Sequence, residues 1–232
     1  MESSPASERR ARLGAVNPLS IAVAVVLLSA GGAFGWRMRT NVPAARPTPE
    51  AAAAALALER VDGRSMCGPE GLRIVREIAM DGPTSDGGAR LADYLPEKSP
   101  LPGYDKVRDG VADPTRDAGY ELGAVDGRIA SFRPEGEGGF DVYAFRFVSP
   151  RAAADAVAAN VVRRVCDFGG VPLRARGRAG LIVVEERRGG GEWSSAWWVT
   201  QSDVVVVRYG GWGDGTTDLA NLAAIAGAAA LF

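Results

Sequence analysis

Histidine is absent from this chain of 232 residues, and only two cysteines are present. Without histidine the chain cannot form a Ser-His-Asp triad, a Cys-His pair or a zinc site with imidazole ligands. An excess of charge is missing too, because 27 basic residues balance 28 acidic ones, so we expect no nucleic-acid partner. Phosphate-loop, C-x-x-C, Ser-x-x-Lys and Gly-x-Ser-x-Gly patterns are also absent, and we expect neither a metal nor an organic cofactor.

A long uncharged run is present at residues 15–36. About 20 apolar residues in an α-helix cross the hydrocarbon core of a bilayer. The centre of the run, Ile21 to Leu28, is aliphatic, and Trp36 closes it with an aromatic typical of the lipid–water boundary. The run therefore predicts one transmembrane helix, with the membrane lipid bilayer as its partner.

The flanking charges do not fix the orientation of this helix, because three arginines precede the run and three follow it closely. The short leading tail favours a cytoplasmic N-terminus. A cleaved signal peptide with a site at Gly31 to Ala33 is the alternative. The apolar run continues through Phe34 and Trp36, which favours an uncleaved signal anchor.

Four regions follow from this interpretation. We expect residues 1–14 to be a cytoplasmic tail and residues 15–36 the transmembrane helix. Residues 37–60 form a Pro/Ala-rich spacer that ends in a stalk helix over 51–60, and residues 61–232 form one extracytoplasmic domain. The expected location is the cell membrane, with a single pass and the C-terminal domain outside.

Residues 61–232 combine helical and strand patterns. Helices are predicted at 69–80, 150–165 and 218–232, with a short helical turn at 91–95 inside a region, 81–114, that is otherwise loop. Strands are predicted at 128–133, 139–148, 181–186, 193–200 and 203–209, the last two joined by a tight turn at Gln201-Ser202. This order predicts an α+β fold with a mainly antiparallel sheet packed with helices.

The two cysteines, Cys67 and Cys166, lie at the ends of predicted helices. Behind an export signal, such a pair predicts a disulfide. Closing a loop of about 100 residues contributes roughly 4–5 kcal/mol in the chain-entropy account. Two free buried thiols are the alternative.

Aromatic residues gather late in the sequence and supply the candidate ligand-binding set. On a strand, Trp193 and Trp197 share one face, whereas Trp198 points to the other. Aromatic surfaces bind sugars, peptides and apolar ligands, and a Gly-rich loop follows at 210–215. Packing between sheet and helix is the alternative. The predicted ligand-binding residues are Trp193, Trp197, Tyr209, Trp212 and Asp214.

A second kind of chemistry is available to four acids that recur every fourth residue, Asp105, Asp109, Asp113 and Asp117. Two carboxylates held close together are sufficient for acid–base hydrolysis. A solvated charged loop is the alternative, because Gly110 and Pro114 interrupt a helix there.

The C-terminal pattern resembles a known family. Tyr143 to Phe147 reads as a strand, Ser149-Pro150 starts an alanine-rich helix that Cys166 closes, and Val204 to Val207 leads to a terminal Ala/Ile helix. This order is similar to extracytoplasmic sensor-type domains of actinobacterial membrane proteins, including the C-terminal domain of mycobacterial sensor kinases. The resemblance implies a disulfide-stabilised α+β domain associated with ligand binding, without the kinase and without a second disulfide.

Together these features predict a membrane-anchored extracytoplasmic module of the cell envelope that binds a protein or glycan and is not an enzyme. A carboxylate-based envelope hydrolase is the first alternative. A purely structural protein-interaction domain is the second.

Overall fold

The computed structural model describes residues 54, 56–61, 66–82, 89–112, 123–188, 191–211 and 215–229. All of them belong to the second of the two compact units of the chain, Pro47–Phe232. The uncharged run at 15–36 and the spacer up to residue 53 lie outside the described residues. Within the ranges just given, no helix is long and apolar enough to cross a membrane.

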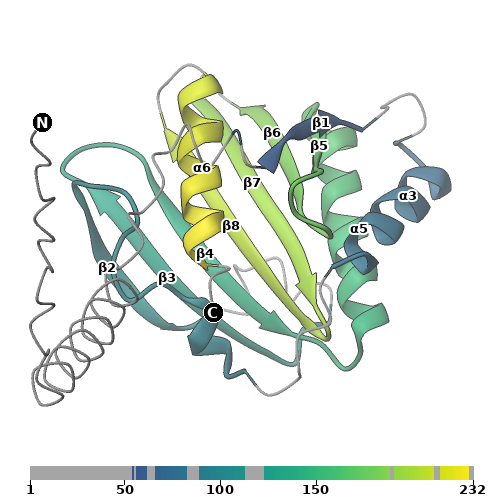
Figure 1. The fold of residues 1–232 in the computed structure, drawn as a ribbon, viewed down its shortest axis with the longest axis horizontal. Coiled ribbons are helices and arrows are strands. Elements are labelled where there is room, and N and C mark those ends of the chain that lie inside the picture. The colour runs from purple at the N-terminus through teal and green to yellow at the C-terminus, as the bar shows by residue number, and fades with distance from the viewer. Residues whose placement is uncertain are drawn as a thin grey trace, which may run out of the picture. The chain divides into compact units, whose positions relative to one another are not determined.

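One antiparallel sheet organises the described part of the chain (Figure 1). Its eight strands are, in chain order, β1 (Leu58–Arg60), β2 (Tyr104–Val111), β3 (Asp126–Pro134), β4 (Gly139–Arg146), β5 (Val171–Ala175), β6 (Ile182–Arg188), β7 (Gly191–Thr200) and β8 (Asp203–Gly211). They lie side by side in the order β1-β5-β6-β7-β8-β4-β3-β2. Two meanders, β2-β3-β4 and β5-β6-β7-β8, thus join where β4 pairs with β8.

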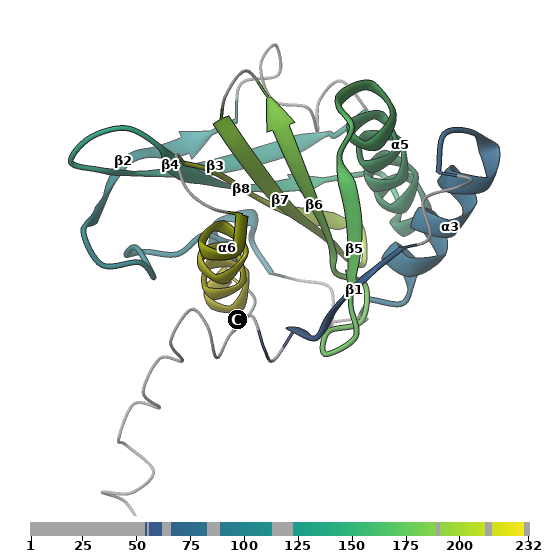
Figure 2. The same ribbon diagram turned by 90° about the horizontal axis from the view of Figure 1, so that it is seen from above.

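Helices cover both faces of this sheet (Figure 2). α3 (Pro69–Met80) and α5 (Pro150–Phe168) pack side by side on one face, which we call the α5 face. α6 (Gly215–Ala229) and the 3-10 helix η2 (Leu91–Tyr94) lie on the other, the α6 face. The central strands therefore bury both sets of alternating side chains, and the valine run at 204–207 is buried throughout.

Local signals fix the position of α5. The Ser149 hydroxyl oxygen accepts a hydrogen bond from the backbone N–H of Ala152 at 3.2 Å, and Pro150 occupies the first helical position. The helix ends at Gly169, whose φ of 66° is the left-handed conformation that glycine adopts readily. It therefore extends three residues beyond the predicted end at Val165.

The α+β fold with an antiparallel sheet is confirmed, while three strands differ from the sequence prediction. β2 forms where a loop was predicted, because an edge strand with solvated charges shows no clear apolar alternation. β5 was not predicted at all, because it has only five residues and contains Pro172, which is unusual within a strand. Leu58–Arg60 pairs with β5 instead of ending the predicted stalk helix, although Ala54 and Leu56 are helical.

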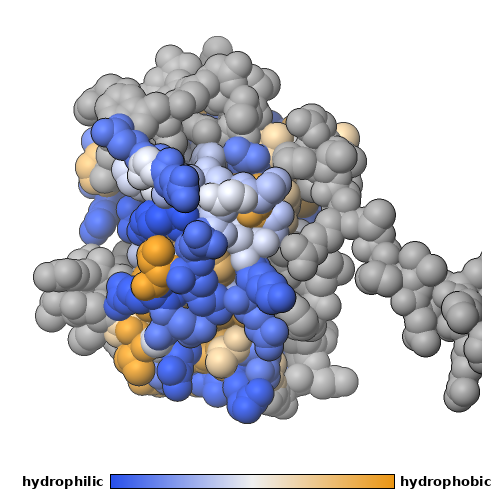
Figure 3. Space-filling view, turned by 90° about the vertical axis from the view of Figure 1, so that its left-hand side faces the viewer, coloured by the Kyte–Doolittle hydropathy of each residue, from blue (hydrophilic) through white to orange (hydrophobic). Residues whose placement is uncertain are grey.

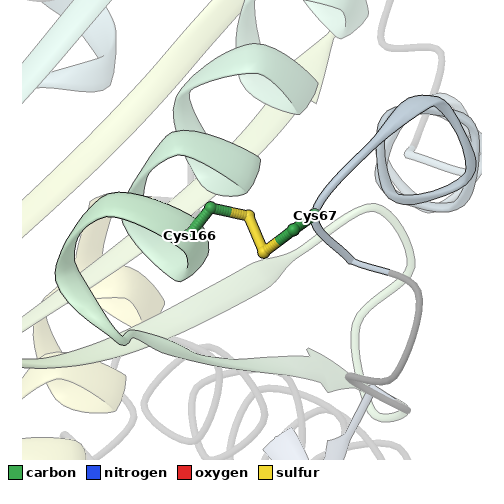
Figure 4. Close-up of a disulfide and its surroundings, with 2 residues drawn as sticks. All are labelled: Cys67 and Cys166. Atoms are coloured by element: carbon green, nitrogen blue, oxygen red, sulfur yellow. A yellow bond between two sulfur atoms is a disulfide. The ribbon is translucent and has the colours of Figure 1, made fainter.

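The predicted disulfide between Cys67 and Cys166 is confirmed (Figure 4). Cys67 lies two residues before α3, and Cys166 lies in the last turn of α5. The sulfur atoms are 2.10 Å apart and the Cα atoms 5.6 Å apart. The bond therefore ties the start of one helix to the end of its neighbour on the α5 face.

Replacing both cysteines by alanine should lower the free energy of unfolding by about 2–5 kcal/mol, because the unfolded chain regains the entropy of a 99-residue separation. Urea unfolding of the full chain, followed by tryptophan fluorescence, measures the change. A reducing agent should shift the wild-type midpoint in the same direction and leave the double variant unaffected. Equal midpoints for the oxidised wild type and the double variant would contradict the expectation.

Candidate functional site

A pocket of about 200 Å³ opens on the α5 face, near the C-terminal end of α5. Strands β6, β7 and β8 and helix α5 supply its walls, which place buried and half-exposed polar side chains around one opening. The lining residues are Arg164, Glu186, Trp193, Ser194, Ser195 and Arg208.

A buried ion pair forms the inner part of the pocket. The Arg164 guanidinium donates a hydrogen bond to the Glu186 carboxylate, and their side chains are only 10% and 2% exposed. The same guanidinium lies 5.2 Å from the centre of the Trp197 ring. Removing one partner of such a pair typically costs about 3–5 kcal/mol, because the other charge remains buried. Arg164 and Glu186 therefore each need the other in order to be buried at this place without a large loss of stability.

Ser195 lies beside this ion pair and is almost fully buried. Its hydroxyl oxygen accepts a hydrogen bond from the Trp197 indole N–H at 2.9 Å. A serine hydroxyl can accept and donate at once, so Ser195 keeps the capacity to donate its O–H beside the ion pair. Trp197 does not line the pocket itself, but its indole N–H holds the Ser195 hydroxyl in place.

Trp193 forms the exposed side of the pocket, with 44% of its surface accessible. Its cross-strand partner is Gly210, and a Cβ atom at Gly210 would overlap the indole ring. An aromatic ring over a strand glycine replaces the packing that the glycine lacks. Gly139, the next residue across the sheet, is covered in the same way by the Arg133 side chain. The two glycines let both side chains lie flat against the backbone.

Arg208 supplies the second positive charge of the pocket. It lies opposite Ser195 on β7 and opposite Asp141 on β4. The Asp141 carboxylate, however, accepts a hydrogen bond from Arg133 at 2.9 Å. Among the residues that the structure describes, none forms an ion pair or hydrogen bond with Arg208. Since Arg164 and Glu186 offset each other, the lining side chains carry a net charge of +1.

The structure separates the aromatic residues that the sequence grouped as a binding set. Trp193 lines the pocket, Trp197 is buried beneath it, and Tyr209 belongs to the core of the α6 face. There the Tyr209 hydroxyl lies 3.1 Å from that of Tyr104 and accepts a hydrogen bond from Asn221. Trp212 and Asp214 lie outside the described residues.

Trp198 also belongs to the α6 face, where the Arg178 guanidinium lies 5.4 Å from the centre of its ring. Burial lowers the pKa of Arg178 from its usual value, because the charged form loses hydration. Packing therefore accounts for Trp198.

The pocket residues that the sequence analysis missed are Arg164, Glu186, Ser194, Ser195 and Arg208. A signal for two of them exists in the alternation along the strands, because Ser195 and Arg208 occupy positions of the α5 face that are otherwise apolar. Glu186 follows an apolar strand segment and Arg164 lies near a helix end, so both resemble surface charges in the sequence.

The acids predicted for hydrolysis do not meet at the pocket. Asp105 and Asp109 lie on the edge strand β2. There the Lys106 ammonium donates a hydrogen bond to the Asp109 carboxylate, with 2.8 Å between Nζ and Oδ2. Asp113 and Asp117 lie outside the described residues. Glu186 is the one carboxylate lining the pocket, and Arg164 binds it. Nowhere in the described ranges do three His, Cys, Asp or Glu side chains gather closely enough to hold a metal ion.

No family model and no curated protein matches this chain. Among solved structures it is similar to the extracellular domain of PknH from Mycobacterium tuberculosis, with a TM-score of 0.34 and 15% sequence identity over 48% of this chain and 68% of that one. A likeness this distant assigns neither a family nor a function.

Replacing Gly210 by alanine should displace the Trp193 ring, because the added Cβ would occupy the place of the indole. We expect a loss of about 0.5–1 kcal/mol in the free energy of unfolding, because the half-exposed ring can move aside and what is lost is one cross-strand contact. Gly110→Ala on β2 is the matched control, since open space surrounds Gly110. Urea unfolding of both variants measures the difference, and equal stability would show that Trp193 does not depend on Gly210.

Proposed function

We propose that this protein is a membrane-anchored extracytoplasmic binding module of the cell envelope and that the pocket beside Trp193 holds a small ligand. The observation that carries the proposal is the pocket itself, where Arg164, Glu186 and Ser195 are buried around an opening. Burying such groups costs solvation energy, and apolar side chains would fill the same space at lower cost. A ligand-binding role accounts for that cost.

Two features support the location. The disulfide between Cys67 and Cys166 is of the kind that persists in oxidising compartments outside the cytoplasm. The uncharged run at residues 15–36 has the length of a membrane-crossing helix. An anchored helix followed by a spacer would hold the pocket outside the membrane.

Neither alternative function gains a comparable observation. Hydrolysis by a carboxylate pair needs two acids facing one cleft, and the pocket has only Glu186 in its lining. A protein-interaction domain would favour a continuous apolar surface. Figure 3 shows the side of the molecule at the β2 edge as mainly hydrophilic, with small separate hydrophobic areas. Three exposed valines, Val107, Val111 and Val125, lie on or near this edge among charged neighbours.

Ligand binding can be followed at Trp193 in the full chain labelled with fluorotryptophan, which gives one ¹⁹F signal for each of its five tryptophans. A Trp193→Phe variant identifies the signal. In a library of single-ring compounds, both charged and neutral, we expect some to shift the Trp193 signal at millimolar concentrations and to leave that of Trp198, on the other face, in place. A library without any such compound would refute the proposed binding site.

The location is tested separately with a thiol reagent that does not cross membranes. We expect it to label a Glu135→Cys variant in intact cells, because Glu135 is exposed in the turn between β3 and β4. Ser4→Cys, in the predicted cytoplasmic tail, is the matched control and should react only after the cells are permeabilised. Equal labelling of both positions in intact cells would contradict the proposed topology.

A further inference from the structure

We infer that the pocket selects a small organic anion, with one ring that lies on Trp193 and one anionic oxygen group that Arg208 binds. This inference rests on the proposed function and adds the chemical class of the ligand. Three properties of the pocket carry it: its uncompensated charge, its supply of hydrogen-bond donors and its exposed ring.

Charge comes first. Within the pocket, the Glu186 carboxylate is bound to Arg164, and no described residue pairs with the half-buried Arg208. Asp141 is the nearest cross-strand acid, and Arg133 engages it. The guanidinium of Arg208 therefore faces a partly desolvated site, where an anion would be held more strongly than in water. A cationic ligand would meet like charge instead.

Hydrogen-bonding capacity distinguishes an anion from a neutral sugar. Arg208 offers guanidinium N–H donors, and Ser195 offers its O–H because its oxygen already accepts from Trp197. The principal acceptor, the Glu186 carboxylate, is engaged by Arg164. Sugar hydroxyls need acceptors as well as donors, whereas a carboxylate or a phosphate ester needs donors only. The supply of donors here matches the anion.

The ring and the volume set the size of the ligand. One side of the Trp193 indole lies against Gly210, and 44% of the residue is exposed. An aromatic or sugar ring can stack on such a surface. The volume of about 200 Å³ is smaller than the roughly 300–1,000 Å³ of sites for drug-sized molecules, so it suits a single ring with one substituent.

The test compares two pairs of probes of similar shape with the full chain: benzoate against benzamide, and glucuronate against glucose. Titration of the Trp193 ¹⁹F signal gives each Kd. We expect the charged member of at least one pair to bind about 10- to 100-fold more tightly than the neutral one, as a charge-assisted hydrogen bond implies. Raising the salt concentration should reduce this preference because it screens exposed charge.

Arg208→Gln should remove most of the preference for the anion. Arg128→Gln is the matched control, since it makes the same change at an exposed position of β3 that alternates onto the α6 face, and it should leave the preference intact. Equal binding of charged and neutral probes, or a preference that survives Arg208→Gln, would overturn the anion assignment. If the wider library shifts Trp193 while these anions have no advantage, the binding proposal stands and this inference fails. If nothing shifts Trp193, both fail.

Discussion

The pairing of β4 with β8 is the contact on which the rest of the fold depends. It joins residues 139–146 to residues 203–211, and it is the seam between two meanders that are each built from neighbouring segments of the chain. Without this pairing, the two meanders would expose strand edges and share no core. With it, eight strands form one sheet whose central strands are buried on both faces, and the valine run of β8 lies among those buried strands.

The pocket lies beside this seam. Gly139 and Gly210 face each other across the pairing, and the side chains of Arg133 and Trp193 fold over them from opposite sides. Arg208 precedes the seam glycine of β8 by two residues and so projects from the same face. The same contact that closes the sheet therefore also brings an aromatic ring and a cation from separate strands to one side of it. The pocket therefore depends on the register in which β7, β8 and β4 pair, and no single sequence motif contains its residues.

Much of the architecture could be predicted from the sequence because its signals are local. Ser149-Pro150 marks the start of α5, and the two-residue turn at Gln201-Ser202 joins two apolar strands; Gln201 adopts the positive φ of 55° that such a tight turn needs. The disulfide followed from the presence of only two cysteines.

β2 was missed because its charged residues suit the edge of a sheet, and position at an edge is a property of the whole sheet. The pocket was missed for a similar reason. Whether Arg164 is a surface cation or a buried partner of Glu186 depends on how α5 lies on β6, which no local pattern records.

The disulfide also determines how the chain responds to mechanical load. Cys67 and Cys166 enclose α3, η2, β2, β3, β4 and almost all of α5 in a covalent loop. A pull on the chain from its N-terminal side would first peel the three-residue strand β1 from β5 and then reach Cys67. From there the force passes through the sulfur atoms to Cys166, so the enclosed segments are not stretched. Under tension the chain can therefore lengthen only by residues outside the loop, and the meander β2-β3-β4 inside the loop is not extended.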